Sequence, residues 1–456
     1  MLGTLGLLAG LGLLIWLALR DVNIIFATVL CALVVIVTNA LPFAQTLTQT
    51  FLLSDLGAFT FAGRFFLLFA AGAVFGKIMG DSHAATSVAM ALVRSLGAHR
   101  ALWITVLSCA LLTYGGVVVF VVIFAMYPLG LRLMHEANIP KRLFCGALAL
   151  GAGTFTLTAL PGTPSILNVI PTLTLGTDLF AAPALGLFGG ALMFVLGMVY
   201  LERERVKALA AGEGFEPGPR DVIPDFSEIE HDVPNPFLAV APLALVIATI
   251  LAPRLAKMAG MGEGAGGLDA LIAFANAQPV LWPSIALVIA SLVAIALFPA
   301  VRKAPLQTMG LGTQDAILPL MATSAVIGFG GVVAQTPGFA AFTGFVIGSD
   351  LPPHLSMFAA ASTVSGITGS SSGGLQIFMA TMAEPYLALG ISPQELHRLA
   401  AMASGGLDSL PHCGAVIAML TITQLTHKQA YKDVGVVTVI VPIVATLATT
   451  ALAMAI

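Results

Sequence analysis

Long apolar runs recur along the whole chain, and they restrict it to one class of fold. The runs extend from Leu2–Leu19 to Val434–Ile456, and most have the roughly 17–25 residues that an α-helix needs to cross a bilayer. Only 9% of the 456 residues are charged, whereas soluble domains carry about 25%. The runs are continuous rather than alternating, which excludes a transmembrane barrel. The sequence therefore predicts an all-α polytopic membrane protein embedded in the lipid bilayer.

Some apolar runs are uninterrupted and others are broken. Uninterrupted spans are expected at Leu2–Leu19, Ile24–Leu41, Ala58–Met79, Ala184–Leu201, Phe237–Leu251, Val280–Phe298, Ala316–Ala334 and Val434–Ile456. Small polar residues, glycine or proline break the runs Ala101–Leu129, Leu143–Thr172, Leu355–Met382 and Leu399–Thr423. Pro42–Gly57 and Met261–Gly267 are expected as loops, and Asp81–Leu96 as an interfacial segment. No positive charge precedes the first run, so we expect a membrane span there rather than a cleaved signal.

One hydrophilic stretch, Glu202–Asn235, divides the chain into two similar halves. Its acidic residues and prolines predict a cytoplasmic linker between an N-terminal repeat, 1–201, and a C-terminal repeat, 236–456. Three short segments recur in the same order at offsets of 258, 250 and 256 residues: Gly115–Phe120 with Gly373–Phe378, Thr158–Gly162 with Asp408–His412, and Gly72–Lys77 with Gly328–Val333. Internal repeats of this kind are typical of secondary transporters.

The distribution of positive charge predicts how the chain crosses the membrane. If the runs around Tyr114 and Ser371 are re-entrant hairpins, each half has about five spans plus one hairpin, and the odd number of spans inverts the second half. With both termini outside, in the periplasm, 15 of the 19 Lys and Arg residues lie in the cytoplasm, three outside and Arg64 in the membrane. The positive-inside rule favours this topology. Arg64 lies near the outer end of its span, so we expect its side chain to snorkel to the interface.

Two of the broken runs contain polar, glycine- or proline-rich segments that predict a substrate site. Non-helical backbone at membrane depth is tolerated only where protein buries it or where it lines a wet cavity. Thr368–Gly374 offers hydroxyls and free N–H groups suited to a carboxylate, although such small residues also allow close helix crossings. Pro161 and Pro164 forbid a regular helix in Leu160–Asn168. The predicted substrate-binding residues are Tyr114, Gly115, Gly116, Gly162, Thr163, Ser165, Asn168, Ser370, Ser371, Ser372, Gly373 and Gly374.

The break in the last broken run contains ionisable residues, and it predicts the coupling site. Asp408, Ser409 and His412 are the predicted ion-coupling residues, because ionisable groups inside a membrane are costly and usually functional. A histidine side chain titrates near neutral pH and can carry a proton. In the alternative interpretation, Asp408 caps the helix that follows it and His412 is only hydrogen-bonded. A sodium ion is also compatible, because unwound carbonyls can coordinate it.

Other chemistries receive less support from the sequence. No His-Glu-x-x-His or Cys-x-x-Cys motif occurs, so neither a metal site nor a cofactor is expected. The net charge of −3 gives no sign of a nucleic-acid partner, and the four cysteines are expected to be free, buried thiols. Gly369–Gly373 matches Gly-x-Ser-x-Gly, with Asp408 and His412 following in hydrolase order. An intramembrane serine hydrolase is therefore the alternative from a different class, but the motif's strand–turn–helix context is missing and we do not expect an enzyme.

Several blocks of the chain resemble the gluconate permease family. They are Leu160–Thr172, Gly369–Gly374, Ser404–Ala415 and Leu425–Asp433. The resemblance implies a bacterial inner-membrane symporter for small hydroxy-carboxylates, usually driven by protons, within the ion-transporter superfamily, whose members are often homodimers that move a hairpin-bearing domain as an elevator. Leu160-Pro-Gly-Thr-Pro164 is more similar to the branch of hydroxybutyrate permeases than to the gluconate branch. The expected substrate is thus a short hydroxy-monocarboxylate such as 3-hydroxybutyrate, or gluconate; a sodium-coupled di- or tricarboxylate transporter is the alternative.

Overall fold

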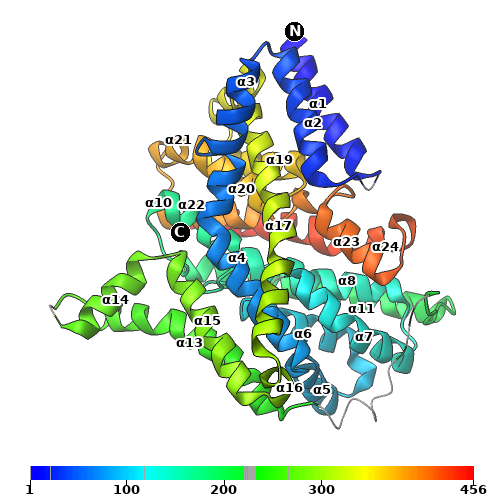
Figure 1. The fold of residues 1–456 in the computed structure, drawn as a ribbon. Coiled ribbons are helices and arrows are strands. Elements are labelled where there is room, and N and C mark those ends of the chain that lie inside the picture. The colour runs from blue at the N-terminus through cyan, green and yellow to red at the C-terminus, as the bar shows by residue number, and fades with distance from the viewer. Residues whose placement is uncertain are drawn as a thin grey trace.

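In a computed structural model the chain folds into a bundle of helices (Figure 1). The structure describes residues 2–20, 22–117, 119–219, 221, 223, 233–264 and 266–456, and none of these lies in a strand. The helices of the first half are α1 (Leu2–Ala18), α2 (Ile24–Thr38), α3 (Phe43–Gln45), α4 (Ala58–Asp81), α5 (Ala84–Leu96), α6 (Ala101–Tyr114), α7 (Val119–Ala137), α8 (Lys141–Gly153), α9 (Phe155–Thr158), α10 (Ile166–Leu175) and α11 (Pro183–Ala210).

The second half repeats this order with a few additions. Its helices are α13 (Pro236–Met258), α14 (Gly267–Ala277), α15 (Leu281–Leu297), α16 (Pro299–Arg302), α17 (Pro305–Ala334), α18 (Pro337–Ile347), α19 (Pro353–Thr368), α20 (Ser371–Thr381), α21 (Ala383–Ala388), α22 (Pro393–Ser404), α23 (Gly414–Thr423), α24 (His427–Gly435) and α25 (Val441–Ala455).

Length and hydropathy confirm a polytopic membrane protein. Within the described residues, five helices are long and apolar enough to span a bilayer, and two bent helix pairs raise the number to seven if each pair counts as one span. One bent pair is α14 with α15, at 110°, and the other is Pro393–Ser409 with α23, at 53°. The remaining apolar helices have 10–17 residues. They include α1 and α2, which lie in two of the expected uninterrupted spans, as well as helices of the first hairpin and the first broken span.

The structure differs from the sequence expectations in four places. Pro42–Gly57, expected as a loop, is largely helical and contains a π-helical turn at Thr46–Phe51 that packs on α17. Helix α17 begins at Pro305 rather than near Ala316, because polar residues continue the helix beyond its apolar part. Helix α11 likewise runs through Glu202 to Ala210, and much of the expected linker lies outside the described residues. Helix α14 follows the Met261–Gly267 loop and was not expected as a separate helix.

The hairpins and broken spans of the two halves occur at a constant separation. Ala101 and Pro353 begin the first hairpin helices, Val119 and Ser371 the second, and Lys141 and Pro393 the broken spans; each pair is 252 residues apart. In this register the turn after Tyr114 matches the turn at Gly369. Gly373 and Gly374, which the sequence match at offset 258 paired with Gly115 and Gly116, lie inside α20 instead.

Helices α4 and α17, which contain the similar segments Gly72–Lys77 and Gly328–Val333, pack against each other in opposite directions. A Cβ atom added at Gly312, early in α17, would meet Val74 and Lys77, late in α4. One added at Gly328, late in α17, would meet Phe51 and Ala58, at the start of α4. The glycines let the helices approach closely, and the antiparallel course is what an inverted repeat requires.

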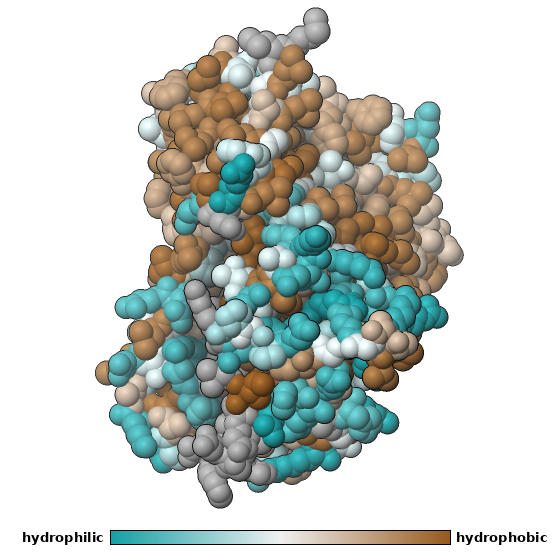
Figure 2. All heavy atoms as spheres, turned by 90° about the vertical axis from the view of Figure 1, so that its right-hand side faces the viewer, coloured by the Kyte–Doolittle hydropathy of each residue, from teal (hydrophilic) through white to brown (hydrophobic). Residues whose placement is uncertain are grey.

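Polar and apolar side chains separate on the surface. On the face that Figure 2 shows, apolar side chains dominate the upper part, at the level of α1 and α2 in Figure 1, while hydrophilic ones gather lower down. Arg64 is exposed on the surface of α4 and does not line the cavity where the hairpins and broken spans meet. All four cysteines are buried and unpaired.

Candidate functional site

The tip of the second hairpin is a tight glycine turn. Helix α19 ends at Thr368, and Gly369 follows with φ +58°, a conformation that favours glycine. A Cβ atom at Gly369 would lie only 2.7 Å from Cδ2 of His412. The Ser370 hydroxyl then accepts a hydrogen bond from the Gly373 N–H at 3.2 Å and caps α20. Glycine is therefore required here both by the turn and by the closeness of the second broken span.

The second broken span places its ionisable residues against this tip. After α22 ends, Asp408 lies in a single 3-10 turn, Leu407–Ser409, and His412 lies in the non-helical stretch before α23, with 8% and 5% of their surfaces exposed. His412 Nε2 donates to the Gly366 carbonyl at 3.2 Å. The Ser409 hydroxyl donates to Asp408 Oδ1 at 3.1 Å, and the Ser371 side chain is also hydrogen-bonded to this carboxylate. No Lys or Arg within the described residues forms an ion pair with Asp408, and its carboxyl is bonded by the hydroxyls of Ser409 and Ser371 and by backbone N–H groups.

The first hairpin and the first broken span lie opposite the second hairpin tip and the second broken span. Gly116 has φ +95°, and a Cβ atom there would lie 3.0 Å from Cγ of Pro164. The Tyr114 hydroxyl donates to the Pro161 carbonyl at 2.8 Å, which ties the hairpin to the break. The Ser165 hydroxyl accepts from the Leu167 N–H at 3.3 Å and caps α10. Tyr114 thus fixes the backbone of the break, whereas Ser165 starts a new helix from it.

A cavity of about 320 Å³ lies where these four elements meet. Both hairpin tips and both breaks line it, and α4 and α17 supply an apolar wall that includes Leu68, Phe69 and Val326. Four helices begin at its edge, since the first residues of α7, α10, α20 and α23 are all among the lining residues. Helix N-termini carry partial positive charge and free N–H groups. Four helix ends with partial positive charge therefore surround the cavity.

The predicted site residues divide into those that line this cavity and those that do not. The lining residues are Gly116, Ser165, Ser370, Ser371, Ser372, Asp408, Ser409 and His412. Tyr114, Gly115, Gly162, Thr163, Asn168, Gly373 and Gly374 are not among them.

The residues outside the lining have packing roles instead. A Cβ atom at Gly374 would lie 2.3 Å from Cα of Ser365, so Gly374 lets α19 and α20 touch. Gly162 lies against the Phe180 ring with φ +84°. Asn168 is fully buried and donates to the Thr163 and Leu179 carbonyls at 2.9 and 2.7 Å. Sequence reasoning did not select the apolar wall, because nothing local distinguishes Leu68 or Val326 from the other apolar residues of their helices.

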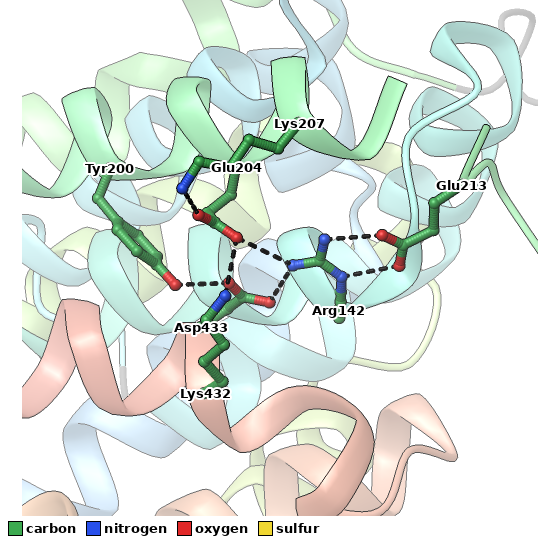
Figure 3. A network of polar contacts seen from close by, with 7 residues as sticks. All are labelled: Arg142, Tyr200, Glu204, Lys207, Glu213, Lys432 and Asp433. Atoms are coloured by element: carbon green, nitrogen blue, oxygen red, sulfur yellow. Dashed lines mark hydrogen bonds and ion pairs between the residues drawn. The ribbon is translucent and has the colours of Figure 1, made fainter. Parts of the chain in front are cut away.

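A second polar region, which we name the Arg142 clasp, joins the start of α8 to α11, α24 and the segment after α11 (Figure 3). Arg142 donates twice to Glu213, at 2.7 Å each, and once to Asp433 at 2.6 Å. Tyr200 also donates to Asp433, at 2.7 Å, and Lys207 and Lys432 contact Glu204 at 2.6 and 3.0 Å. The hydrogen bonds from Arg142 lower the pKa of Glu213.

Asp221 adds a buried ion pair beside this clasp. Its carboxylate accepts from Lys141 Nζ and from the Tyr127 hydroxyl, each at 2.6 Å, and from Gln424 at 2.9 Å. Burial by itself would raise the pKa of Asp221, but the donors, Lys141 first among them, bring it below its ordinary value. The sequence predicted no contact for this hydrophilic segment, because its charges read as a solvated linker.

Known proteins with similar sequences or structures are transporters. No protein-family model matches the chain. A Bacillus subtilis (strain 168) protein described as the uncharacterized transporter YxjC is 39% identical over 461 residues, covering 95% of each chain. The crystal structure of the Alcanivorax borkumensis YdaH transporter, whose title notes an unusual topology, superposes with a TM-score of 0.54 at 14% identity over 86% of each chain. That likeness concerns the fold alone.

Proposed function

The chain belongs to the transporter family of Bacillus subtilis YxjC, and we propose that it moves a small organic anion across the bacterial inner membrane by cation-coupled symport. The observation that supports this most is the convergence of four helix N-termini on one cavity. Fixed backbone dipoles favour a carboxylate there without needing a cation. The resemblance to gluconate permeases and the size of the cavity favour a short hydroxy-monocarboxylate such as 3-hydroxybutyrate.

Each part of the site takes one role in this proposal. The N–H groups of α20 and α10, with the hydroxyls of Ser371 and Ser165, bind the carboxylate. Asp408 and His412 exchange the coupling proton, because a carboxyl and an imidazole beside one anion can bind a proton whose affinity depends on the anion's charge. In the serine-hydrolase alternative His412 would activate Ser371, but His412 Nε2 is bonded to the Gly366 carbonyl instead.

The proposed movement is an elevator. The hairpins and broken spans surround the cavity on one side, while α4 and α17 close it from the other with an apolar wall. An apolar wall binds no substrate group and allows the hairpin-bearing unit to slide past it. A homodimer, which the family resemblance suggests, would hold the wall fixed in the membrane.

Uptake into proteoliposomes tests the proposed function. The purified protein is reconstituted and given labelled 3-hydroxybutyrate, gluconate, succinate or citrate, with proton and sodium gradients imposed separately. We expect accumulation of 3-hydroxybutyrate on a proton gradient alone. Accumulation of succinate or citrate on a sodium gradient only would favour the di- or tricarboxylate alternative, and no uptake of any of the four would contradict the proposal.

Cysteine labelling tests the proposed topology, in which both termini are periplasmic, residues 1–201 and 236–456 are inverted repeats, and 202–235 is cytoplasmic. Glu216 and Glu263 are exposed on the two connecting segments, so Glu216→Cys and Glu263→Cys should react with an impermeant maleimide from opposite sides of the membrane. Reaction from the same side would contradict the inversion.

A further inference from the structure

A largely buried cluster, which we name the His397 clasp, joins the end of the first broken span to the start of the second. Its members are Asn168, Thr177, Leu179, His397 and Arg398. His397 and Arg398 lie in the second turn of α22 and are 0% exposed. The ring of His397 contacts Asn168 Oδ1 at 3.0 Å and the Thr177 hydroxyl at 2.7 Å. Two segments more than 200 residues apart in sequence are therefore joined by one imidazole.

The hydrogen bonds of this cluster define the tautomer of His397. The Asn168 amide nitrogen donates to the carbonyls of Thr163 and Leu179, so Asn168 Oδ1 can only accept. His397 Nε2 must then carry a proton and donate to that oxygen. In the neutral ring Nδ1 accepts, and the Thr177 hydroxyl supplies its hydrogen. Both ring nitrogens of His397 and the Asn168 amide oxygen thus have one defined partner each, and the Asn168 amide nitrogen has two.

Arg398 binds the same backbone without a carboxylate. Its Nε donates to the Ala181 carbonyl at 3.1 Å and its Nη2 to the Leu179 carbonyl at 3.3 Å. The Leu179 carbonyl also accepts from the Gly162 N–H at 2.8 Å and from Asn168 at 2.7 Å. Three donors from three segments converge on this one oxygen. Within the described residues Arg398 forms no ion pair, and its Nη1 has no hydrogen-bond partner.

The His397 clasp supports the backbone that forms one wall of the cavity, although none of its own residues lines the cavity. Gly162 and Asn168, which it holds, flank Ser165, and Ser165 begins α10 at the cavity edge. The prolines on either side of Thr163 prevent a helix from supporting this backbone. The Thr163 hydroxyl is itself buried with no hydrogen-bond partner. The hydrogen bonds of His397 and Arg398 therefore support the break from the second half, in addition to the bond from Tyr114 to the Pro161 carbonyl.

The other end of the two broken spans offers a natural control. Cys145 is the fifth residue of α8, as His397 is of α22. Its thiol contacts the Thr423 hydroxyl at 3.2 Å, at the end of α23. The broken spans thus run antiparallel and are joined at both ends, but at the Cys145 end the ion pairs of the Arg142 clasp add further support. Loss of the Cys145 contact should leave the first break unaffected.

We propose that His397 and Arg398 are positioning residues for substrate binding: they hold the Gly162–Asn168 break of the first half from the second half, without touching substrate. The role in binding rests on the proposed function, whereas the support of the break does not. Substitutions that preserve the donor and acceptor of the clasp should preserve the break, and substitutions that remove them should loosen it.

Hydrogen exchange of the purified full-length protein in detergent tests this directly. Wild type is compared with three kinds of variant. His397→Gln keeps one hydrogen-bond donor and one acceptor, whereas His397→Ala and Arg398→Gln remove hydrogen-bond partners of the clasp. Cys145→Ala is the control. We expect amides of 159–168 to exchange about tenfold or more faster in His397→Ala and Arg398→Gln, because a lost hydrogen bond lowers the local opening free energy. Exchange there should stay within about threefold of wild type in His397→Gln and Cys145→Ala.

A transport readout separates positioning from general loss of stability. In the loosened variants half-saturation for 3-hydroxybutyrate exchange should rise about tenfold while the maximal rate falls less than about threefold, and His397→Gln should restore it. Unchanged amide exchange at 159–168 in both His397→Ala and Arg398→Gln would overturn the proposal. An increase in amide exchange at 424–433 as large as that at 159–168 would also overturn it. A variant that unfolds is replaced by Thr177→Val, which removes one hydrogen bond of the same ring. If wild type transports no carboxylate, the proposed function fails, and the exchange result still decides the positioning.

Discussion

The two broken spans have the same arrangement of helix, break and helix. They differ in the side chains that their breaks contain. In the first, the Asn168 side chain is fully used by hydrogen bonds to Thr163, Leu179 and His397. The Tyr114 hydroxyl is bound to the break's own Pro161 carbonyl. In the second, Asp408 and His412 both line the cavity and bond only to the hairpin tip or to the next residue. The comparison teaches that one break can keep the shape of the site while the other carries titratable groups.

Replacing Asp408 should have the largest effect, because it removes the one buried carboxyl at the cavity. We expect Asp408→Asn to abolish proton-driven accumulation of 3-hydroxybutyrate in proteoliposomes. Thr158, its sequence match in the first half, bonds only to its own helix, so Thr158→Val should retain accumulation close to that of wild type. Equal losses in both variants would remove the functional difference between the breaks.

Replacing His412 should separate binding from coupling. His412→Gln keeps a hydrogen-bond donor for the Gly366 carbonyl but cannot carry a proton. Exchange of labelled for unlabelled substrate, which needs no net proton movement, should persist, while accumulation on a pH gradient should be lost. If His412→Gln still accumulates substrate on that gradient, the histidine is structural and Asp408 carries the coupling alone.

Ser371 and Thr163 compare a hydroxyl inside the cavity with one outside it. Ser371→Ala should weaken substrate binding by about 1.5 kcal/mol, or roughly tenfold, because a hydrogen bond to a carboxylate is lost. The Thr163 hydroxyl has no hydrogen-bond partner, so Thr163→Val should change affinity less than about twofold. Calorimetric titration with 3-hydroxybutyrate measures both, and a larger effect for Thr163 would move the site into the first break.

The smallest expected effect concerns the Arg142 clasp, whose side chains are held together by ion pairs. Hydrogen bonds from Arg142 depress the pKa of Glu213 in the folded protein. The ionised Glu213 therefore stabilises the fold fully above its unfolded pKa of about 4.3, and this stabilisation is lost as pH falls through its pKa in the folded protein. Thermal unfolding should show Glu213→Gln less stable than wild type by about 1 kcal/mol at pH 7, with the difference vanishing at acid pH. A difference that grows as pH falls would contradict this account.

The sequence predicted the main features of the fold, and eight of the fifteen predicted site residues line the cavity. Long apolar runs located the spans, and prolines and glycines located both breaks and the second hairpin tip, because these signals are local. Tyr114, Asn168 and Gly374, predicted to bind substrate, lie outside the cavity lining, and the sequence could not place them because a polar or small residue at a break can serve substrate or packing. For a different reason, His397 and Arg398 were not selected. Their role depends on Leu179, more than 200 residues earlier, and no local pattern records such a contact.

Substrate protection of engineered cysteines tests most directly whether the two halves form one site. Ser165 and Ser371 are partly exposed, line the cavity, and come from the first break and the second hairpin. Ser165→Cys and Ser371→Cys, each in a background with the four native cysteines replaced, are labelled with a small thiosulfonate with and without 3-hydroxybutyrate. We predict that 3-hydroxybutyrate slows labelling at both positions with the same half-maximal concentration, while neutral 3-hydroxybutyramide slows neither. Protection at one position only would contradict a single anion site shared by the two halves.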